Sequence, residues 1–285
     1  MSDTATVPVD LSEVPHEPGA QKPDPILVVD DVRRAFGGLV AVDVDHLEIQ
    51  RGIITALIGP NGAGKTTLFN LLSGFDDPDR GRWVFEGDDI SGMPAHKIAQ
   101  QGMVRTFQLT KALHKMHVID NMKLGATGQR GESMLTALIP GQWRNQERDI
   151  ESRADDLLER FKLKDKRHEY AGELSGGQRK LLEMARALMV QPSLLLLDEP
   201  MAGVNPALTQ SLLGHVEALR DEGMSIVFVE HDMDVVMGIS DWVVCMAEGK
   251  VIAEGTPESI GSNTAVIDAY LGETHDEPIK DAKDG

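Results

Sequence analysis

The sequence predicts an α/β fold that combines a parallel sheet with an antiparallel β portion and a helical subdomain. Three observations indicate this fold class. An apolar run at residues 53–58 leads into a glycine-rich loop and then into a stretch with helical periodicity. A second short apolar run, at residues 194–197, ends in two acidic residues. Between these runs, apolar side chains recur at three- and four-residue intervals, the spacing of an amphipathic helix.

The organisation of the chain follows from its composition. Residues 1–25 and 273–285 are rich in acidic residues and hold few large apolar ones, so both are predicted to be disordered acidic arms around a folded region at 26–272. Within that region, we expect antiparallel strands at 26–50 and 82–87 and a helical subdomain at about 108–187. The parallel core then takes the residues from the 50s to about 107 and from about 190 onward.

The first glycine-rich loop, "GPNGAGKTT", has the features of a phosphate site. It follows the expected strand Ile53–Ile58 and precedes one apolar helix face formed by Leu68, Leu71, Leu72 and Phe75. This strand–loop–helix context is what the G-x-x-x-x-G-K-[ST] pattern requires. Backbone N–H groups at the glycines cradle phosphate, the lysine reaches the β- and γ-phosphates, and the first threonine binds Mg²⁺. The predicted contact residues are Gly59, Pro60, Asn61, Gly62, Ala63, Gly64, Lys65, Thr66 and Thr67.

The run "PSLLLLDEP" predicts a central parallel strand that ends in two carboxylates. The carboxyl ends of such strands are where α/β sheets bind ligands. Asp198 is therefore a candidate Mg²⁺ ligand, and Glu199 is a candidate for polarising an attacking water. The alternative for Glu199 is an ordinary solvated carboxylate at the end of a strand.

A further buried strand, Ser225–Val229, ends just before His231. A histidine at the carboxyl end of a parallel strand can hydrogen-bond the γ-phosphate and hold the water and Glu199 in position, although lone histidines are more often structural. His231 is therefore predicted to take part in catalysis.

The stretch "ELSGGQRKLLEMARAL" predicts a second anion site. Two glycines precede a helix whose apolar face is Leu181, Met184, Ala185 and Leu188. A serine hydroxyl, free backbone N–H groups and the helix dipole together favour a negative charge. An ordinary serine cap explains the serine but not the residues after it. The predicted contact residues are Ser175, Gly176, Gly177 and Gln178.

Charge and cysteine content exclude several classes of protein. The formal net charge of −18 argues against nucleic acid as the main partner and against an anionic membrane surface. One cysteine, Cys245, excludes an internal disulfide and fits a reducing compartment. No apolar run approaches the length of a membrane span, and the first residues lack the features of a signal peptide. We therefore expect a cytosolic chain.

The phosphate loop, "LSGGQ", "LLLLDEP" and "EHD", in this order, resemble the ATP-binding cassette (ABC) ATPases over nearly all of residues 26–272. "LSGGQ" is the most specific of these motifs. The resemblance implies a P-loop NTPase core, with ATP and Mg²⁺ as cofactors. It also implies that Gln108 in "VRTFQ" contacts Mg²⁺ and assists catalysis, and that Phe36 stacks on adenine, unless Phe36 is simply a core residue of a strand. Asn205, in "AGVNP", stands where many family members have aspartate.

The resemblance also implies which phosphate the predicted anion site at Ser175–Gln178 binds. In ABC ATPases, two cassettes face each other, and each ATP lies between the phosphate loop of one chain and "LSGGQ" of the other. A second ABC ATPase subunit, the same chain or a paralogue, is therefore an expected partner. Because no span is found in this chain, we also expect separate permease subunits, which would hold it at the cytoplasmic side of the cell membrane.

Closer matching points to one transport system. "FGGLVAVDVDHLEI", "EHDMDVVMGISD", the ending "GTPESI...VIDAYLGE" and the long stretch 125–152 resemble the larger ATPase subunit of branched-chain amino acid importers. Such importers imply a periplasmic or extracellular binding protein as an indirect partner. Urea or amide importers, a lipid or lipopolysaccharide exporter, and a soluble non-transport ABC ATPase are the alternatives.

The end of the folded region predicts three local features. "DWVVCMAEGKVIAEG" indicates a hairpin that turns at Glu248 and Gly249. Thr256 and Pro257 form the start of a helix, with proline at its first position. Gly272 is expected to end the final helix.

Overall fold

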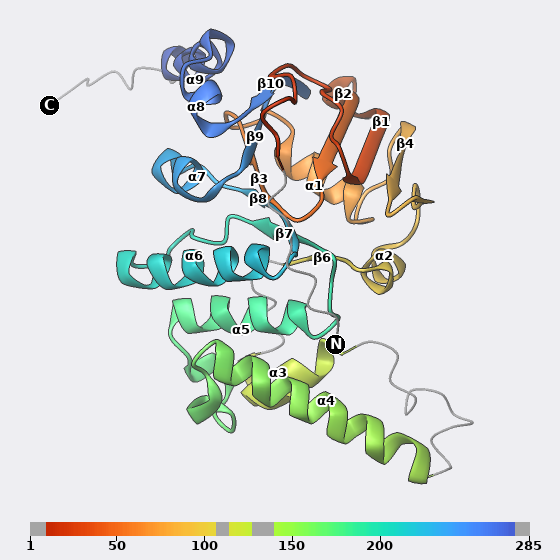
Figure 1. Cartoon of the computed structure of the whole chain (residues 1–285), viewed down its shortest axis with the longest axis vertical. Coiled ribbons are helices and arrows are strands. Elements are labelled where there is room, and N and C mark those ends of the chain that lie inside the picture. The colour runs from red at the N-terminus through yellow and green to blue at the C-terminus, as the bar shows by residue number, and fades with distance from the viewer. Residues whose placement is uncertain (1–9, 107–113, 127–139, 277–285) are drawn as a thin grey trace, which may run out of the picture. The chain divides into compact units, whose positions relative to one another are not determined.

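The computed structural model describes residues 10–106, 114–126 and 140–276 (Figure 1). The chain divides into two compact units. Unit 1 comprises residues 1–93 and 227–285, and unit 2 comprises residues 94–226. No described helix has both the length and the apolar character needed to cross a lipid bilayer.

Unit 1 contains the expected antiparallel strands. The order in this sheet is β2-β1-β4-β5, and all of its neighbouring strands are antiparallel. Alternate residues of the first strand, such as Leu27 and Val29, are fully buried, as the two-residue period of a strand with one covered face requires. The bounds are Pro25–Phe36 for β1, Leu39–Gln50 for β2, Arg80–Phe85 for β4 and Asp88–Asp89 for β5.

A second set of strands in unit 1 supports the phosphate loop. β3 (Ile54–Ile58) is parallel to β9 (Trp242–Ala247), which forms an antiparallel hairpin with β10 (Lys250–Gly255). Every residue of β3 is buried, so its apolar run needs no alternation. The predicted hairpin is confirmed, because Glu248 and Gly249 both have the positive φ that a two-residue type I′ turn requires.

The helices of unit 1 confirm one sequence prediction and correct two. Thr256 caps α8 (Pro257–Gly261) with proline at the first turn, as predicted. However, α1 (Lys65–Leu72) ends before Phe75, whose side chain is half exposed rather than part of the buried helix face. Gly272 also does not end the final helix, because α9 (Thr264–Asp276) continues past it. The described part of this unit also contains α7 (Met233–Ile239).

The segment 10–24 differs from the expected disordered arm. Leu11, Val14 and Ala20 are buried, and the His16 ring meets the Trp242 ring edge-on at 5.4 Å between centroids. Three apolar side chains and one aromatic contact therefore provide the burial that the composition of the segment did not suggest. Residues 1–9 and 277–285 lie outside the described residues.

A buried ion pair holds this segment to the rest of unit 1. Lys22 Nζ lies 2.7 Å from Glu254 Oε2, with both side chains fully buried. Glu254 also accepts hydrogen bonds from the Ala20 amide and from Trp242 Nε1, both at 2.9 Å. Because a buried charge is costly unless it is paired and hydrogen-bonded, the ion pair and the hydrogen bonds to Glu254 explain why both charged side chains can lie inside.

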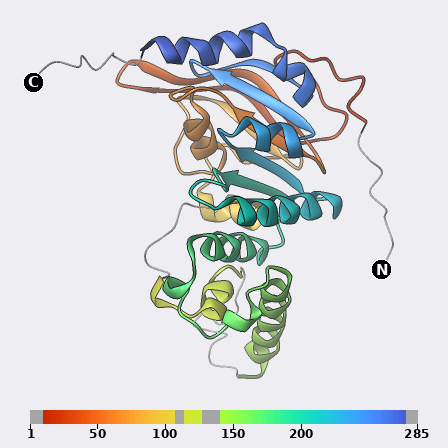
Figure 2. The ribbon, with the colours of Figure 1, turned by 90° about the vertical axis from the view of Figure 1, so that its left-hand side faces the viewer.

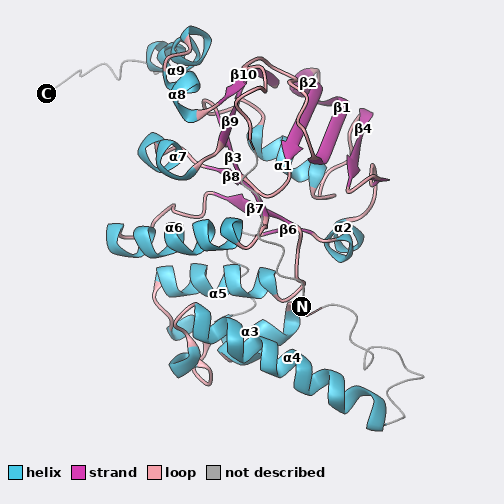
Figure 3. Cartoon of the chain, in the orientation of Figure 1, coloured by secondary structure: helices cyan, strands magenta, loops and turns pink. Residues whose placement is uncertain are grey.

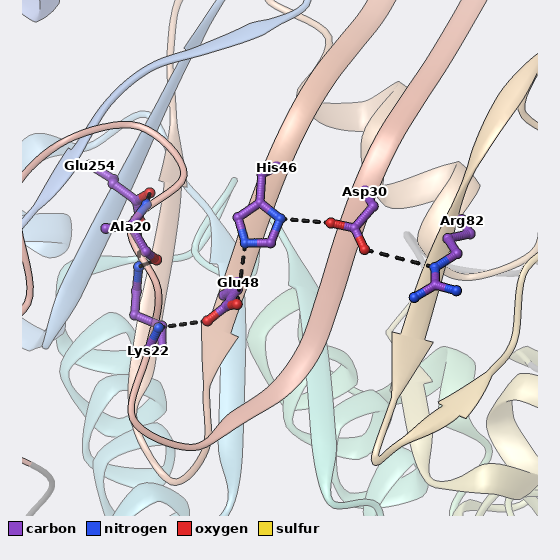
Figure 4. A network of polar contacts seen from close by, with 7 residues as sticks. All are labelled: Ala20, Lys22, Asp30, His46, Glu48, Arg82 and Glu254. Atoms are coloured by element: carbon purple, nitrogen blue, oxygen red, sulfur yellow. Dashed lines mark hydrogen bonds and ion pairs between the residues drawn. The ribbon is translucent and has the colours of Figure 1, made fainter.

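The polar contacts continue across the antiparallel sheet (Figure 4). The Lys22 amide donates to Glu48 Oε2 at 2.6 Å. His46 lies between Glu48 and Asp30, at 3.2 Å and 2.7 Å, and Arg82 approaches Asp30 at 3.8 Å. These contacts link the segment before β1 to three strands of unit 1.

Unit 2 is mainly helical (Figure 3). β6 (Met103–Arg105) pairs with β7 (Leu194–Asp198) in parallel, and β8 (Ser225–Val229) lies at the boundary between the units. The predicted apolar helix face after "LSGGQ" is confirmed, since all four of its residues are buried. Ala154, Leu158 and Phe161 are buried as well. The helices are α2 (Ala95–Gln101), α3 (Val118–Leu124), α4 (Pro140–Arg160), α5 (Gly176–Leu188) and α6 (Pro206–Asp221), with 3₁₀ turns η3 (Lys164–Lys166) and η4 (Ala171–Glu173).

Candidate nucleotide site

The phosphate loop connects β3 to α1 within unit 1. Gly59, Gly62 and Gly64 have φ values of 143°, 77° and 101°, which L residues with side chains rarely adopt. Two of the three are also confined by backbone. A Cβ at Gly59 would lie 2.0 Å from the Met246 carbonyl oxygen, and one at Gly64 would lie 2.3 Å from that of Ala41. These two glycines are therefore required by packing as well as by backbone conformation.

Lys65 folds back over the loop that precedes it. Its Nζ donates to the Gly59 carbonyl and, at 2.8 Å, to the Pro60 carbonyl, and the residue is buried. The ammonium group thus lies against the first two residues of the phosphate loop. Thr66, the next residue in the chain, is exposed. A bound anion and these carbonyl oxygens are alternative partners for the same charge.

Tyr270 is a residue of this site that sequence reasoning missed. Its hydroxyl accepts a hydrogen bond from the Gly59 amide at 2.9 Å, although the two residues are 211 positions apart. Tyr270 belongs to α9, close to the end of the described chain. No local pattern links a tyrosine in a C-terminal helix to a glycine after β3, so only the tertiary structure identifies it.

The strand beside the loop contains the one cysteine of the chain. Cys245 is fully buried in β9 opposite Ile58, the last residue of β3. Burial raises the pKa of its thiol to about 11, and the nearby positive charge of Lys65 offsets only part of that rise. The thiol is therefore protonated and unreactive near neutral pH.

Phe36, the predicted adenine-stacking residue, ends β1 and is 48% exposed. It is therefore not a core phenylalanine. The Arg34 guanidinium lies over its ring, 4.6 Å from the ring centroid to Cζ. Asp76 in turn holds that guanidinium through Nε and Nη2 at 3.0 Å and 2.7 Å. The ring is thus supported by a clamped cation while it stays open to a stacking partner.

In unit 2, Asp198 is the last residue of β7 and is paired with an arginine. Arg105 Nη2 lies 2.6 Å from Asp198 Oδ2, and only 7% and 15% of the two side chains are exposed. Arg105 ends β6, the parallel neighbour of β7, which explains why the two side chains meet. Arg105 was not predicted from the sequence, although it lies in the quoted "VRTFQ" motif.

The candidate water-polarising residue has an unusual backbone. Glu199 has a φ of 46°, in the left-handed region that few glutamates occupy. Its carbonyl accepts a hydrogen bond from Lys180 Nζ at 3.0 Å, which links the end of β7 to α5. A strained conformation that is held by a specific contact is a common feature of functional positions.

His231 follows β8 in unit 1 and is exposed. Its backbone amide donates to Glu230 Oε2 at 3.3 Å, and the buried Glu230 lies immediately before it. Asp232 then caps α7 by accepting from the amides of Asp234 and Val235. The turn that presents the histidine is therefore fixed by two carboxylates.

The second predicted anion site is a complete capping box in unit 2. The Ser175 hydroxyl accepts from the Gln178 amide at 3.2 Å, and the Gln178 side chain accepts from the Ser175 amide at 3.0 Å. Gly177 has a packing role, since a Cβ there would lie 1.5 Å from Leu208 Cδ2 of α6, whereas Gly176 meets only the tip of Arg179. Asn205 caps α6 in the same unit by accepting from the Leu208 amide at 3.0 Å.

Gln108 lies outside the described residues, as does part of the stretch 125–152. Among the described residues, no group of three or more His, Cys, Asp and Glu side chains forms a metal site. Mg²⁺ needs only one or two protein ligands, because nucleotide oxygens and waters complete its octahedron. The exposed Thr66 hydroxyl and the partly exposed Asp198 carboxylate are donors of the right kind.

Two family models match the chain. Residues 42–202 match the model of the ABC transporter family, and residues 250–276 match that of branched-chain amino acid ATP-binding cassette transporters.

Known relatives resemble the chain over most of its length. A probable branched-chain amino acid transport ATP-binding protein LivG of Archaeoglobus fulgidus is 43% identical, over 87% of this chain and 95% of that protein. The high-affinity branched-chain amino acid transport ATP-binding protein BraF of Pseudomonas aeruginosa is 41% identical, over 87% and 98%. A solved nucleotide-free ATP-binding cassette of an ABC transporter has a TM-score of 0.76 at 36% identity, over 86% of this chain and 98% of that one. A cassette solved in its ADP conformation has a TM-score of 0.75 at 36% identity, over 87% and 99%.

Proposed function

Because the chain belongs to the ABC transporter family, in which it is an ATP-binding and ATP-hydrolysing subunit, we propose that it powers the import of branched-chain amino acids. The match of residues 250–276 to the branched-chain model carries the substrate assignment. This region is distinct from the motifs common to all ABC ATPases, so it carries information that the phosphate loop does not. The names of the relatives support the same substrate class.

In this proposal, the phosphate loop binds the nucleotide. The amides of the loop contact the β-phosphate, and Lys65 exchanges its carbonyl partners for phosphate oxygens. Phe36 stacks on adenine through the ring face that Arg34 leaves open. The loop glycines allow the close approach because no Cβ obstructs it.

Hydrolysis depends on residues at the ends of β7 and β8. We assign Mg²⁺ binding to Thr66, Asp198 and Gln108, with Arg105 orienting the aspartate. When bound, the ion would neutralise negative charge on the phosphates. Glu199 orients the attacking water and accepts its proton, and His231 hydrogen-bonds the γ-phosphate. The hydrogen bond from Lys180 to the backbone carbonyl of Glu199 fixes the backbone from which the catalytic carboxylate extends.

The second anion site acts on the nucleotide of another subunit. In the Ser175–Gln178 box the Gln178 amide binds the serine, and the Gly176 and Gly177 amides at the start of α5 contact the γ-phosphate. A second copy or a paralogue is therefore the proposed partner, and permease subunits hold the pair at the cytoplasmic side of the membrane. A binding protein outside the membrane delivers the amino acid to the permease.

Uptake of labelled leucine tests the substrate. In the source organism, deletion of the gene should abolish high-affinity uptake of leucine, isoleucine and valine, and the wild-type chain should restore it. Glu199→Gln is the matched inactive control, because it should bind ATP normally yet hydrolyse it about 10²–10³-fold more slowly. Unchanged leucine uptake with loss of urea or amide uptake would reassign the substrate, and loss of lipid export would support the exporter alternative.

Complementation of two inactive variants tests the pairing of sites. Lys65→Ala damages the phosphate loop of its own chain, and Ser175→Arg blocks its anion site. In a complex with permease that contains both variants, one composite site combines an intact Lys65 with an intact Ser175. ATPase activity should partly return on mixing. No return, in complexes shown by mass spectrometry to hold both variants, would contradict the trans site, provided that a Lys65→Ala and wild-type pair stays active as the one-site control.

A further inference from the structure

The hydrogen bond between α9 and the phosphate loop suggests a role for the C-terminal helix. The Tyr270 hydroxyl accepts from the Gly59 amide at 2.9 Å. We infer that Tyr270 is a positioning residue whose hydroxyl fixes the Gly59 peptide and thereby raises the affinity of the loop for nucleotide. This inference rests on the proposed nucleotide-binding role of the loop.

The helix that carries Tyr270 is well anchored in unit 1. Asn263 caps its start by accepting from the Ala265 and Val266 amides at 2.9 Å and 3.4 Å. Val266 is buried, and Tyr270 lies one helical turn later on the same face. The helix packs against β10, and Figure 2 shows it in dark blue alongside the strands of unit 1. Tyr270 is therefore presented from a fixed support rather than from a loose terminus.

Gly59 is the position of the loop where an extra restraint matters. Without a Cβ, its backbone rotates more freely than that of any other residue type. Met246 of β9 confines one side of it, since its carbonyl oxygen would be 2.0 Å from a Cβ there. The Lys65 ammonium holds the Gly59 carbonyl, and the Tyr270 hydroxyl holds the Gly59 amide. The two side chains thus restrain the two peptide groups that flank one flexible residue.

These two restraints respond differently to nucleotide. When Lys65 turns to the phosphates, the Gly59 carbonyl loses its ammonium partner. The Tyr270 hydroxyl holds the Gly59 amide rather than its carbonyl, so that bond can persist. Tyr270 would then keep the loop in its nucleotide-binding conformation while Lys65 changes partners. The loop therefore loses less conformational entropy when nucleotide binds. The effect should be equal for ATP and ADP, because the loop restraint precedes any contact with the γ-phosphate.

Tyr270→Phe tests this role in the full chain, because it removes only the hydroxyl. The Kd for ADP and the KM for ATP should both rise about fivefold, the loss typical of one neutral hydrogen bond, with kcat within about twofold of wild type. Hydrogen exchange at the Gly59 amide, measured without nucleotide, should become faster. A purely structural helix residue would not change that single amide selectively.

Two control variants match the substitution. Tyr170→Phe removes the hydroxyl of the only other tyrosine of the chain, which lies in unit 2. Ile267→Ala removes an exposed side chain from the same helix. Neither should alter the Kd or the Gly59 exchange. Lys65→Ala should lose nucleotide binding, so it reports separately whether the loop is the nucleotide site.

The outcomes separate the inference from the proposed function. Weaker binding with faster Gly59 exchange in Tyr270→Phe alone supports the positioning role. An unchanged Kd in Tyr270→Phe, while Lys65→Ala abolishes binding, would overturn that role and leave the nucleotide site intact. Equal weakening in Ile267→Ala would also overturn it, since the helix rather than the hydroxyl would then be responsible. Normal binding in Lys65→Ala would instead contradict the proposed site itself.

Discussion

The two anion-binding segments of this protein reach their shapes in opposite ways. The phosphate loop of unit 1 is shaped by residues far away in the chain, including the Met246 and Ala41 carbonyls and the Tyr270 hydroxyl. The segment Ser175–Gln178 of unit 2 is shaped by a capping box within four consecutive residues. The shape of the phosphate loop therefore depends on the assembled fold, whereas that of Ser175–Gln178 is encoded locally. Leu208, which is distant in sequence, packs closely against this segment at Gly177.

The largest effect should come from the loop that depends on distant residues. Gly59→Ala should weaken ADP binding by more than about 100-fold or prevent folding, because its Cβ would clash with a backbone oxygen at 2.0 Å. Gly62→Ala is the matched control, since nothing lies within 4 Å of its Cβ and only the positive φ costs about 1–2 kcal/mol. Calorimetry with ADP and thermal unfolding measure both. Equal effects of the two variants would mean that backbone conformation, not distant packing, shapes the loop.

The Ser175–Gln178 segment should show smaller effects on stability, of opposite sign at its two glycines. Gly177→Ala should lower the free energy of unfolding by about 1–3 kcal/mol, because Leu208 must shift to admit the methyl group. Gly176→Ala should raise it by about 0.5–1 kcal/mol, since a helical alanine loses less entropy than glycine. Denaturant titration checks both. If Gly176→Ala also lowers ATPase activity of the assembled transporter, the phosphate needs the space that the missing Cβ leaves, whereas normal activity would mean that the backbone amide alone is enough.

The strand beside the phosphate loop should make unit 1 sensitive to alkaline pH. The raised pKa of Cys245 means that the folded protein holds its thiol proton more tightly than the unfolded chain, whose pKa is about 9.0. The stabilisation is complete below that value and decreases as pH rises toward 11, by about 1 kcal/mol at pH 10. Cys245→Ala should lack this part of the pH dependence in urea titrations. Rapid iodoacetamide labelling of the native protein at pH 8 would contradict the buried, protonated thiol.

Unit 2 should show the smallest effect, at acidic pH. Desolvation lowers the pKa of His215 first, and the charges of Arg160 and Lys162 lower it further. The unfolded chain therefore binds more protons, so this contribution to stability is present above the unfolded pKa of about 6.5 and is lost as pH falls through the folded value. His215→Gln should flatten the change in unfolding midpoint between pH 7 and 5. A histidine resonance that titrates at or above the usual value would refute the prediction.

Local sequence determined much of this fold. The Ser175 capping box, the Thr256 cap and the turn at Glu248 and Gly249 follow from residue types within a few positions of one another. The glycine pattern also located the phosphate loop, although the shape of that loop depends on distant residues. Such features depend on φ preferences and short-range hydrogen bonds, which adjacent residues control. Phe75 and Gly272 show the limit of periodicity, because a spacing of apolar residues does not state where a helix stops.

The tertiary structure decided the rest. The Tyr270–Gly59 bond, the Arg105–Asp198 pair and the buried Lys22–Glu254 pair join residues that are 211, 93 and 232 positions apart. Composition made residues 10–24 look disordered, yet Lys22 is buried because Glu254 neutralises its charge from β10. The local sequence around a polar side chain does not indicate which residue it will pair with in the folded protein. Whether it is buried, and what it holds in place, depends on the free energy of pairing after the whole chain has folded.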